Sequence, residues 1–324
     1  MASSARPAPG RGRNWTELPE DVTASILSRL GAIEILTSAQ MVCATWYNIC
    51  KDPLMWCTID LRDLDHQKHI HYDLEKMCRH AVDRSSGNLV GINVEDNGSD
   101  ELLNYITNCS SGIKRLRLVR CDGITNEGLA TVASKLPLLE DLEISYCAFS
   151  HEPLAVVGSS CPLLKSFKFN NRWYRWSDEE CDDDALAIAG TMHDLRHLQL
   201  FGNKLTNDGL LAILDHCPQL ESLDLRQCFN LKLGGKLRRR CAEQMKKLWF
   251  PDDSTLDYEF DSAIDYHEDN PFGYSDIDLM SDDDKDYDFC NRKVEDDEEY
   301  DFNYGSGSDD CREVEDNDVY PWIV

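Results

Sequence analysis

Fourteen cysteines and nine histidines are the side chains with which this chain could bind a metal or perform nucleophilic chemistry. Structural zinc sites use cysteine and histidine at characteristic short spacings, C-x-x-C pairs above all. The sequence contains no such pair, and its densest group (His66, His69, His71, Cys78 and His80) fits no standard zinc pattern. We therefore expect these histidines to be solvated and the protein to hold no metal.

The Asp-rich segment 282–289 is the nearest approach to a calcium-binding loop. Such a loop needs glycine at its sixth position and glutamate at its twelfth, where this chain has Tyr287 and Lys293. Glycine-rich phosphate-binding motifs and the G-x-S-x-G nucleophile motif are also missing. The sequence predicts a non-catalytic protein that uses no cofactor.

A unit of the form apolar-x-x-apolar-x-apolar recurs seven times between Leu89 and Phe250. Successive units are separated by 24, 26, 25, 31, 25 and 25 residues, and in five of them an Asn or Cys follows three residues later. This is the leucine-rich-repeat signature. We expect an α/β solenoid, a horseshoe, over residues 86–250, in which each repeat supplies a short strand and a returning helix. The Asn or Cys should turn the chain and meet the backbone of the neighbouring coil.

Solenoids bind partners on their concave surface or through insertions. The one long interval contains an insertion rich in the residue types that dominate interfaces, namely Trp173, Tyr174, Arg175 and Trp176. The strand positions expected on the concave surface include Arg117, Glu143, Lys168, Gln199 and Asp224. We predict that both groups contact a protein substrate. That the rings of the insertion merely fold back over the repeats remains an open alternative.

The net charge of −27 is concentrated at one end of the chain. Residues 251–324 hold 27 of the 60 acidic residues and 4 of the 33 basic ones, so residues 1–250 carry only −4. We expect 251–324 to be a disordered acidic tail and residues 1–13, rich in Ala, Pro, Gly and Arg, to be disordered too. Nucleic acid is not an expected partner, because binding it needs clustered positive charge.

Six basic residues precede the tail: Lys236, Arg238, Arg239, Arg240, Lys246 and Lys247. They are consistent with a nuclear-import signal, a docking site for the tail, or an ordinary solvated face. No apolar run is long enough to span a membrane, and the first residues do not resemble a secretory signal. Scattered, unpaired cysteines then favour a reducing compartment, the nucleus or the cytoplasm.

Residues 15–60 differ in character from the repeats. Leu-Pro opens a helical pattern in "ELPEDVTASILSRL", and "MVCATW" and "DPLMW" follow in order. The order and spacing of these phrases resemble the F-box, a three-helix module, and an F-box followed by leucine-rich repeats is a known family layout, with plant members most similar in phrasing. The resemblance implies a substrate receptor of a ubiquitin ligase that binds a Skp-type adaptor and, through it, cullin and RING subunits. Residues 61–85 would connect the F-box to the repeats.

By this resemblance, the following residues would contact the adaptor or be shared between adaptor and helical core: Leu18, Pro19, Ile26, Leu27, Leu30, Val42, Cys43, Trp46 and Trp56. Ala44 departs from the basic residue that many members carry after Val-Cys. Two alternatives stay open. The helical segment could be a plain cap for a repeat scaffold unconnected with ubiquitination, or the protein could bind basic partners through its acidic tail.

Overall fold

The computed structural model describes residues 15–62, 73–96, 98–171 and 179–260. The segment predicted to be disordered at 1–13, most of the acidic tail, and Trp173 to Trp176 lie outside these ranges. Residues 15–254 belong to one compact unit, and Thr255 begins a second.

The described repeats form one parallel sheet whose strands follow each other in sequence order. Adjacent strands pair in register, so that Ile92, Leu116, Leu142 and Phe167 lie in one row across the sheet. The strands are β1 (Thr58–Asp60), β2 (Gly91–Glu95), β3 (Arg115–Val119), β4 (Asp141–Ser145), β5 (Ser166–Asn170), β6 (His197–Gln199), β7 (Ser222–Asp224) and β8 (Lys247–Trp249).

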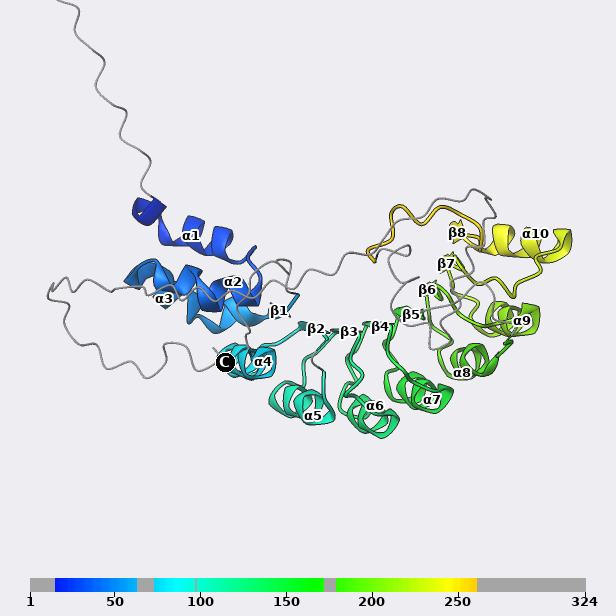
Figure 1. Cartoon of the computed structure of the whole chain (residues 1–324), viewed down its shortest axis with the longest axis horizontal. Helices are drawn as coiled ribbons and strands as arrows, with labels where there is room; N and C mark the ends of the chain where they lie inside the picture. Colours follow the sequence, from blue (N-terminus) through cyan, green and yellow to red (C-terminus); the bar gives the residue numbers. More distant parts are fainter. Residues whose placement is uncertain (1–14, 63–72, 97, 172–178, 261–324) are drawn as a thin grey trace, which may run out of the picture. The chain divides into compact units, whose positions relative to one another are not determined.

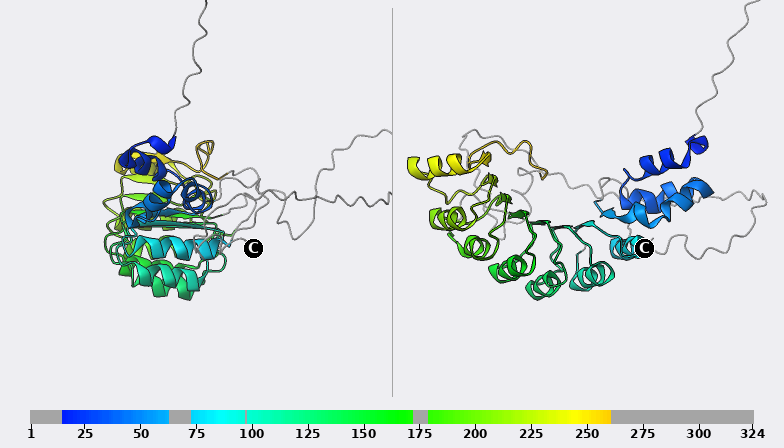
Figure 2. Two further views of the ribbon diagram at one scale, coloured as in Figure 1. Left: turned by 90° about the vertical axis from the view of Figure 1, so that its left-hand side faces the viewer. Right: turned by 180° about the vertical axis from the view of Figure 1, so that it is seen from behind.

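One helix follows nearly every strand, and these helices lie together on the same side of the sheet (Figures 1 and 2). They are α4 (Leu74–Ser85), α5 (Asp100–Cys109), α6 (Asn126–Ala133), α7 (His151–Ser160), α8 (Asp183–Thr191), α9 (Asn207–His216) and α10 (Gly235–Gln244). The inward apolar residues of strands and helices form one continuous core. Because no repeat can bury its own apolar face, the stack is the folding unit. The predicted leucine-rich-repeat fold is confirmed.

The array begins one unit earlier than the sequence analysis predicted. Strand β1 pairs with β2, and its Ile59 lies beside Ile92. Trp56, Ile59 and Leu61 are all buried and have the spacing of the repeat unit. Helix α4 lies in the segment predicted to be a connector (61–85), where it packs against α5 as the first helix of the array.

The turn after each strand has a recurrent geometry. The residue before the Asn or Cys has a positive φ in five repeats: Asp96, Arg120, Tyr146, Gly202 and Gln227. The Cys121 thiol then donates to the carbonyl oxygen of Val94 at 3.5 Å, and the Cys228 thiol donates to that of Leu200 at 2.9 Å. Both carbonyls belong to the preceding repeat, as predicted. Burial raises the pKa of the Cys228 thiol, which therefore stays protonated and able to donate.

The phrase Thr-Asn-x-Gly-Leu links neighbouring helices. Thr125 caps α6 by accepting from the Gly128 N–H. The Asp100 carboxylate of the preceding repeat accepts from the Thr125 N–H at 2.8 Å and from its hydroxyl at 2.7 Å. A Cβ at Gly128 would lie 1.7 Å from the Asp100 Oδ1. Glycine therefore leaves room for the aspartate that joins the two repeats.

The N-terminal residues form the predicted three helices, joined by short 3₁₀ turns. The helices are α1 (Glu20–Leu27), α2 (Ala32–Thr37) and α3 (Ala44–Cys50), and the 3₁₀ turns are η1 (Trp15–Glu17), η2 (Ala39–Met41) and η3 (Pro53–Trp56). Glu20 and Asp21 in the first turn of α1 favour its start, since their charges complement the helix dipole. Pro53 occupies the first position of η3, where its missing N–H costs nothing.

Helix α4 also joins these N-terminal helices to the repeats. The Arg84 guanidinium donates to the Gln40 Oε1 at 3.0 Å and lies 5.4 Å from the Trp56 ring. The Trp56 indole donates to the Cys50 carbonyl at 2.8 Å, and the Gln40 amide donates to the Leu36 carbonyl at 2.6 Å. The N-terminal helices thus pack directly on the first helix of the array.

Candidate protein-binding surfaces

An apolar ridge lies along the exposed face of α1. Val22 and Ile26 are four residues apart and share one face of the helix, where their side chains are 42% and 36% exposed. Thr23 and Leu27, each one residue further on, are buried. Pro19 is exposed three residues before Val22. We call Pro19, Val22 and Ile26 the α1 ridge. Its spacing of three and four residues is that of a helix that docks in a partner's groove.

Further apolar side chains are exposed on the elements beside α1. Val42, between η2 and α3, is 50% exposed, and Met41 before it is exposed as well. Leu54 in η3 and Trp15 in η1 are more exposed still. None of Val22, Met41, Leu54 and Trp15 is among the adaptor contacts predicted from the sequence. The helical spacing between Val22 and Ile26 is the sequence signal that indicates Val22 as a contact.

Burial corrects two of the predicted adaptor contacts. Leu27 is fully buried on the inner face of α1. The Trp56 side chain in η3 is buried beside α3 and α4, so neither residue has surface to offer a partner. Both stabilise the core instead. The structure leaves Pro19, Ile26 and Val42 exposed, and leaves Leu18, Leu30, Cys43 and Trp46 half-buried. These seven remain predicted adaptor contacts.

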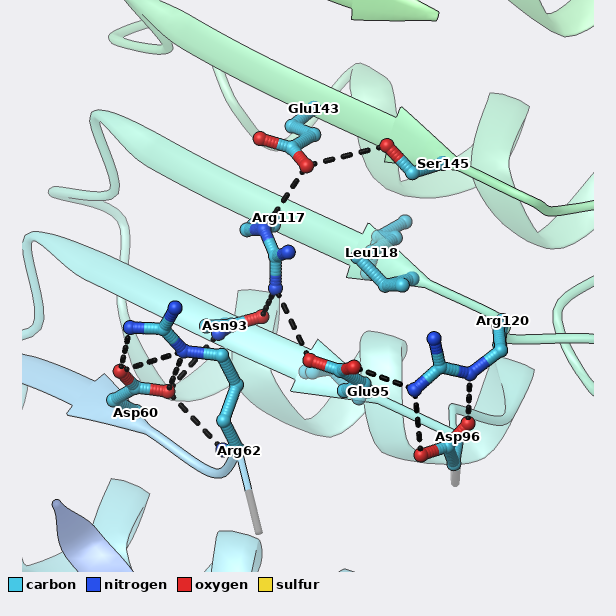
Figure 3. A network of polar contacts seen from close by, with 12 residues as sticks. Asp60, Arg62, Asn93, Glu95, Asp96, Arg117, Leu118, Arg120, Glu143 and Ser145 are labelled. Atoms are coloured by element: carbon cyan, nitrogen blue, oxygen red, sulfur yellow. Dashed lines mark hydrogen bonds and ion pairs between the residues drawn. The ribbon is translucent and has the colours of Figure 1, made fainter. Parts of the chain in front are cut away.

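The sheet face opposite the helices, called here the open face, carries a row of polar side chains across successive strands (Figure 3). Strand register places Asp60, Asn93, Arg117, Glu143 and Lys168 side by side in that order. Asn93 donates to Asp60 at 3.0 Å, and Arg117 donates to Asn93 and to Glu143, each at 3.0 Å. Lys168 donates to the other oxygen of Glu143 at 2.9 Å. The row is a continuous chain of hydrogen bonds and ion pairs across five strands.

A second arginine extends this network at the ends of the strands. Arg117 donates to Glu95 at 3.2 Å, and Arg120 donates to the other Glu95 oxygen at 2.6 Å. Arg120 also pairs with Asp96 at 2.6 Å (Figure 3). Each charge in the network thus has a partner of opposite sign. This part of the open face is consequently unsuited to binding a strongly charged ligand.

The environment of Glu143 keeps it ionised. Burial of its carboxyl raises the pKa, but the Lys168 ammonium and the Arg117 guanidinium more than offset that effect, so the pKa lies below its usual range. Ser145 donates a further hydrogen bond to the same carboxylate at 3.2 Å. The side chain is buried and fully engaged, which corrects the prediction that Glu143 contacts a substrate.

The predicted contacts at Asp224 and Arg117 need the same revision. Asp224 is buried, and its carboxylate receives hydrogen bonds from the Arg226 guanidinium, among them those at 3.0 and 2.7 Å. Arg226 in turn donates to the Ser254 carbonyl at 2.9 Å, so its guanidinium is engaged within the fold as well. Arg117 is largely buried within the network of Figure 3. Lys168 and Gln199 retain exposed surface and remain predicted substrate contacts.

Other sequence predictions fall partly outside the described residues. His66, His69, His71 and the Asp-rich segment 282–289 lie there, as does the aromatic insertion from Trp173 to Trp176. Within the described ranges, no three His, Cys, Asp or Glu side chains gather as metal ligands would. Burial raises the pKa of the Cys78 thiol to about 12. None of the helices that the structure describes has the length and apolarity needed to cross a membrane.

Comparison with known proteins matches both parts of the chain. Residues 15–62 match the family model described as F-box-like, and residues 191–214 match a leucine-rich-repeat model. The F-box protein SKIP19 of Arabidopsis thaliana is 52% identical over 288 residues, which cover 88% of this chain and 93% of that protein. F-box/LRR-repeat protein 22 of the same plant is 47% identical over 76% of this chain and 80% of its own length. The F-box protein FBW2 is 32% identical over 73% and 75%.

Proposed function

This chain belongs to the F-box/leucine-rich-repeat proteins, and from that premise we propose that it is the substrate-recognition subunit of a Skp–cullin–F-box ubiquitin ligase. In this role the F-box binds a Skp-type adaptor, and the adaptor links the chain to cullin and RING subunits. The repeats hold a protein substrate. The chain itself is non-catalytic, because the transfer of ubiquitin takes place on partner subunits, and we place it in the nucleus or the cytoplasm.

The observation that supports this proposal best is the α1 ridge. A free-standing cap needs apolar residues only on its inner face, and those are Leu27, Ile35 and Leu36 here. The outer face of α1 exposes a further set at helical spacing, and Val42 is exposed on the segment before α3. Contiguous exposed apolar residues mark interaction surfaces. The F-box therefore has one face for the repeats, through α4, and another for the adaptor.

Substrate binding is assigned to the less engaged part of the repeats. The polar network across β1 to β5 satisfies its own charges, whereas Gln199 in β6 and the exposed Arg115 and His197 at the starts of strands make no ion pair with any described residue. These side chains are available to a protein partner, and Lys168 keeps exposed surface beside its ion pair with Glu143. Mixed polar contacts of this kind suit a folded protein surface better than a small ligand.

The test is the affinity of the full chain for a Skp-type adaptor, measured by calorimetric titration for the wild type and for Val22→Glu/Val42→Glu. Placing two charges in an apolar interface should weaken binding by at least about tenfold. The matched control is Val156→Glu/Leu186→Glu, which alters side chains on α7 and α8 that are 38% and 52% exposed. Circular dichroism establishes that all three chains are folded.

The proposal predicts that the control variant binds the adaptor as tightly as the wild type does. Equal binding by the Val22→Glu/Val42→Glu variant would place the adaptor elsewhere. A folded wild-type chain that binds no Skp-type adaptor would make the helical segment a structural cap, and the ligase assignment would be wrong.

A further inference from the structure

The last helix of the array carries a concentration of positive charge that neither the adaptor surface nor the open face uses. Helix α10 contains Lys236, Arg238, Arg239 and Arg240. Lys246 directly precedes β8, and Lys247 is the first residue of that strand. No other described helix has four residues that are Lys or Arg. We call these six residues the basic cluster.

The four members of the basic cluster in α10 lie away from the core. Leu237 and Cys241, four residues apart, face the core, whereas Lys236 and Arg239 are exposed on another face, with half-exposed Arg240 beside them. Like charges three and four residues apart repel each other and destabilise a helix. An anionic partner along this face would offset that repulsion.

Only part of the basic cluster is neutralised within the fold. Arg240 pairs with Asp215, and Lys246 pairs with Glu221 at 2.8 Å. The Arg238 guanidinium lies 3.8 Å from the centre of the Phe250 ring. Lys236, Arg239 and Lys247 have no carboxylate within ion-pair distance among the described residues. Three exposed cations are therefore available to bind an anion.

The same chain contains an anionic segment of matching character. Glu295 to Asp301 holds six carboxylates in seven residues, and about forty residues separate it from Ser254. A connection of that length can extend to roughly 130 Å, whereas α10 is only about 15 Å long. The segment can therefore reach the basic cluster from any direction. Attachment to the same chain also gives it a concentration advantage over a free partner.

We propose that the acidic segment Glu295–Asp301 binds the basic cluster of α10 within the same molecule. The contact is electrostatic, so it forms at low ionic strength and weakens as salt screens the exposed charges. It covers the terminal helix of the array and keeps other acidic chains from it. The contact is independent of adaptor binding, because it uses neither the α1 ridge nor Val42.

The test uses full-length chains and a fluorescein-labelled peptide of residues 293–303, followed by fluorescence anisotropy at about 0.01 M salt, where the screening length is about 30 Å. In one variant the acidic segment is neutralised: Glu295→Gln, Asp296→Asn, Asp297→Asn, Glu298→Gln, Glu299→Gln and Asp301→Asn. If the segment normally occupies the basic cluster, this variant should bind the peptide at least about tenfold more tightly than the wild type does.

The place where the peptide binds is tested in the variant with the neutralised acidic segment, called here the neutralised chain. Three positive charges are removed from it, either within the basic cluster or elsewhere. Lys236→Gln/Arg239→Gln/Lys247→Gln should weaken peptide binding by roughly tenfold. The control, Lys76→Gln/Lys114→Gln/Lys165→Gln, removes the same charge from exposed lysines that already pair with Asp73 or Glu140, and it should bind as the neutralised chain does.

Either of two results overturns the proposal. Equal peptide binding by the wild type and the neutralised chain means that the segment does not occupy the basic cluster and that the cluster is open to other partners. An equal loss of peptide binding in the two triple variants means that net charge, and not the position of the basic cluster, governs binding. Neither result bears on the adaptor, whose binding is measured separately.

Discussion

At the scale of single residues, glycine in the repeated phrase is required by a neighbouring side chain rather than by its own backbone angles. Gly128 and Gly209 both lie in regular helices and neither has a positive φ. A Cβ at Gly209 would lie 2.3 Å from the Asp182 Oδ1, and Asp182 binds Thr206 as Asp100 binds Thr125. The aspartate, the threonine and the glycine form one unit that joins successive helices.

Gly128→Ala should therefore destabilise the protein, because the new methyl group displaces the Asp100 carboxylate from Thr125. Loss of these hydrogen bonds should lower the free energy of unfolding by about 1–3 kcal/mol. In an Asp100→Ala background the same glycine change should instead be neutral or stabilising by up to about 1 kcal/mol, since alanine favours helix. Urea unfolding of the wild type, the two single variants and the double variant measures this double-mutant cycle.

Gly190→Ala serves as the control for this cycle, because no atom lies within 4 Å of its expected Cβ. It should leave the free energy of unfolding unchanged or slightly raised. If Gly128→Ala lowers the free energy of unfolding equally with and without Asp100, the aspartate is not the reason that glycine is required at position 128.

At the scale of elements, strand register creates the polar network of the open face. Parallel in-register strands bring equivalent residues of successive repeats together, and Arg117, Glu143 and Lys168 alternate in sign. Removing one member of such a hydrogen-bonded network costs free energy, because it leaves the remaining charges without a partner. The network thus ties β1 to β5 and holds the F-box end of the sheet to its middle.

Glu143→Gln should lower the free energy of unfolding at about pH 7 by roughly 1–3 kcal/mol, since it removes a charge that two cations share. The folded-state pKa of Glu143 is depressed, so the ionised carboxylate stabilises the fold above its unfolded pKa of about 4.3. That contribution is lost as the pH falls through the lower folded-state pKa. The difference between the wild type and the variant should therefore shrink as the pH falls from the unfolded pKa through the lower folded-state pKa in urea titrations.

Glu140 provides the comparison for Glu143. It bridges Lys114 and Lys165 just before the same strands, but its side chain is 37% exposed. Glu140→Gln should leave the unfolding free energy nearly unchanged at every pH. An equal effect of the two substitutions would mean that burial of the network contributes nothing.

The strands and helices of the repeats could be predicted because each repeats one apolar pattern. The sequence does not predict strand β1, because Trp56, the first apolar residue of its repeat unit, also ends the F-box pattern. Ile59 precedes Ile92 by 33 residues, an interval longer than the usual repeat. The helical spacing of Met77, Cys78, Ala81 and Val82 was nevertheless present in the predicted connector.

The candidate surfaces were harder to predict, because residue type does not fix exposure. Leu27 and Ile26 are adjacent in sequence and equally apolar, yet the way α1 packs buries one and exposes the other. Glu143 and Asp224 occupy strand positions that usually face solvent. Their burial depends on Arg117, Lys168, Arg226 and the segment that ends at Ser254.

At the scale of the whole molecule, the F-box and the repeats are one continuous structure. Trp56 closes the F-box and opens the first repeat unit, and Arg84 of α4 binds Gln40 and lies against the Trp56 ring. A substrate receptor needs this rigidity, because the ligase must present its substrate at a defined position. Packed side chains, rather than a linker, thereby join the surface that we propose for the adaptor to the surface that we propose for the substrate.

The most direct test of this account is assembly. Full-length protein is mixed with a Skp-type adaptor, a cullin and a RING subunit, and the mixture is analysed by size-exclusion chromatography with light scattering. The account predicts one complex that contains all four chains for the wild type and for Val156→Glu/Leu186→Glu, and loss of this chain from the complex for Val22→Glu/Val42→Glu. A folded wild-type chain that elutes apart from the assembled adaptor and cullin would contradict it.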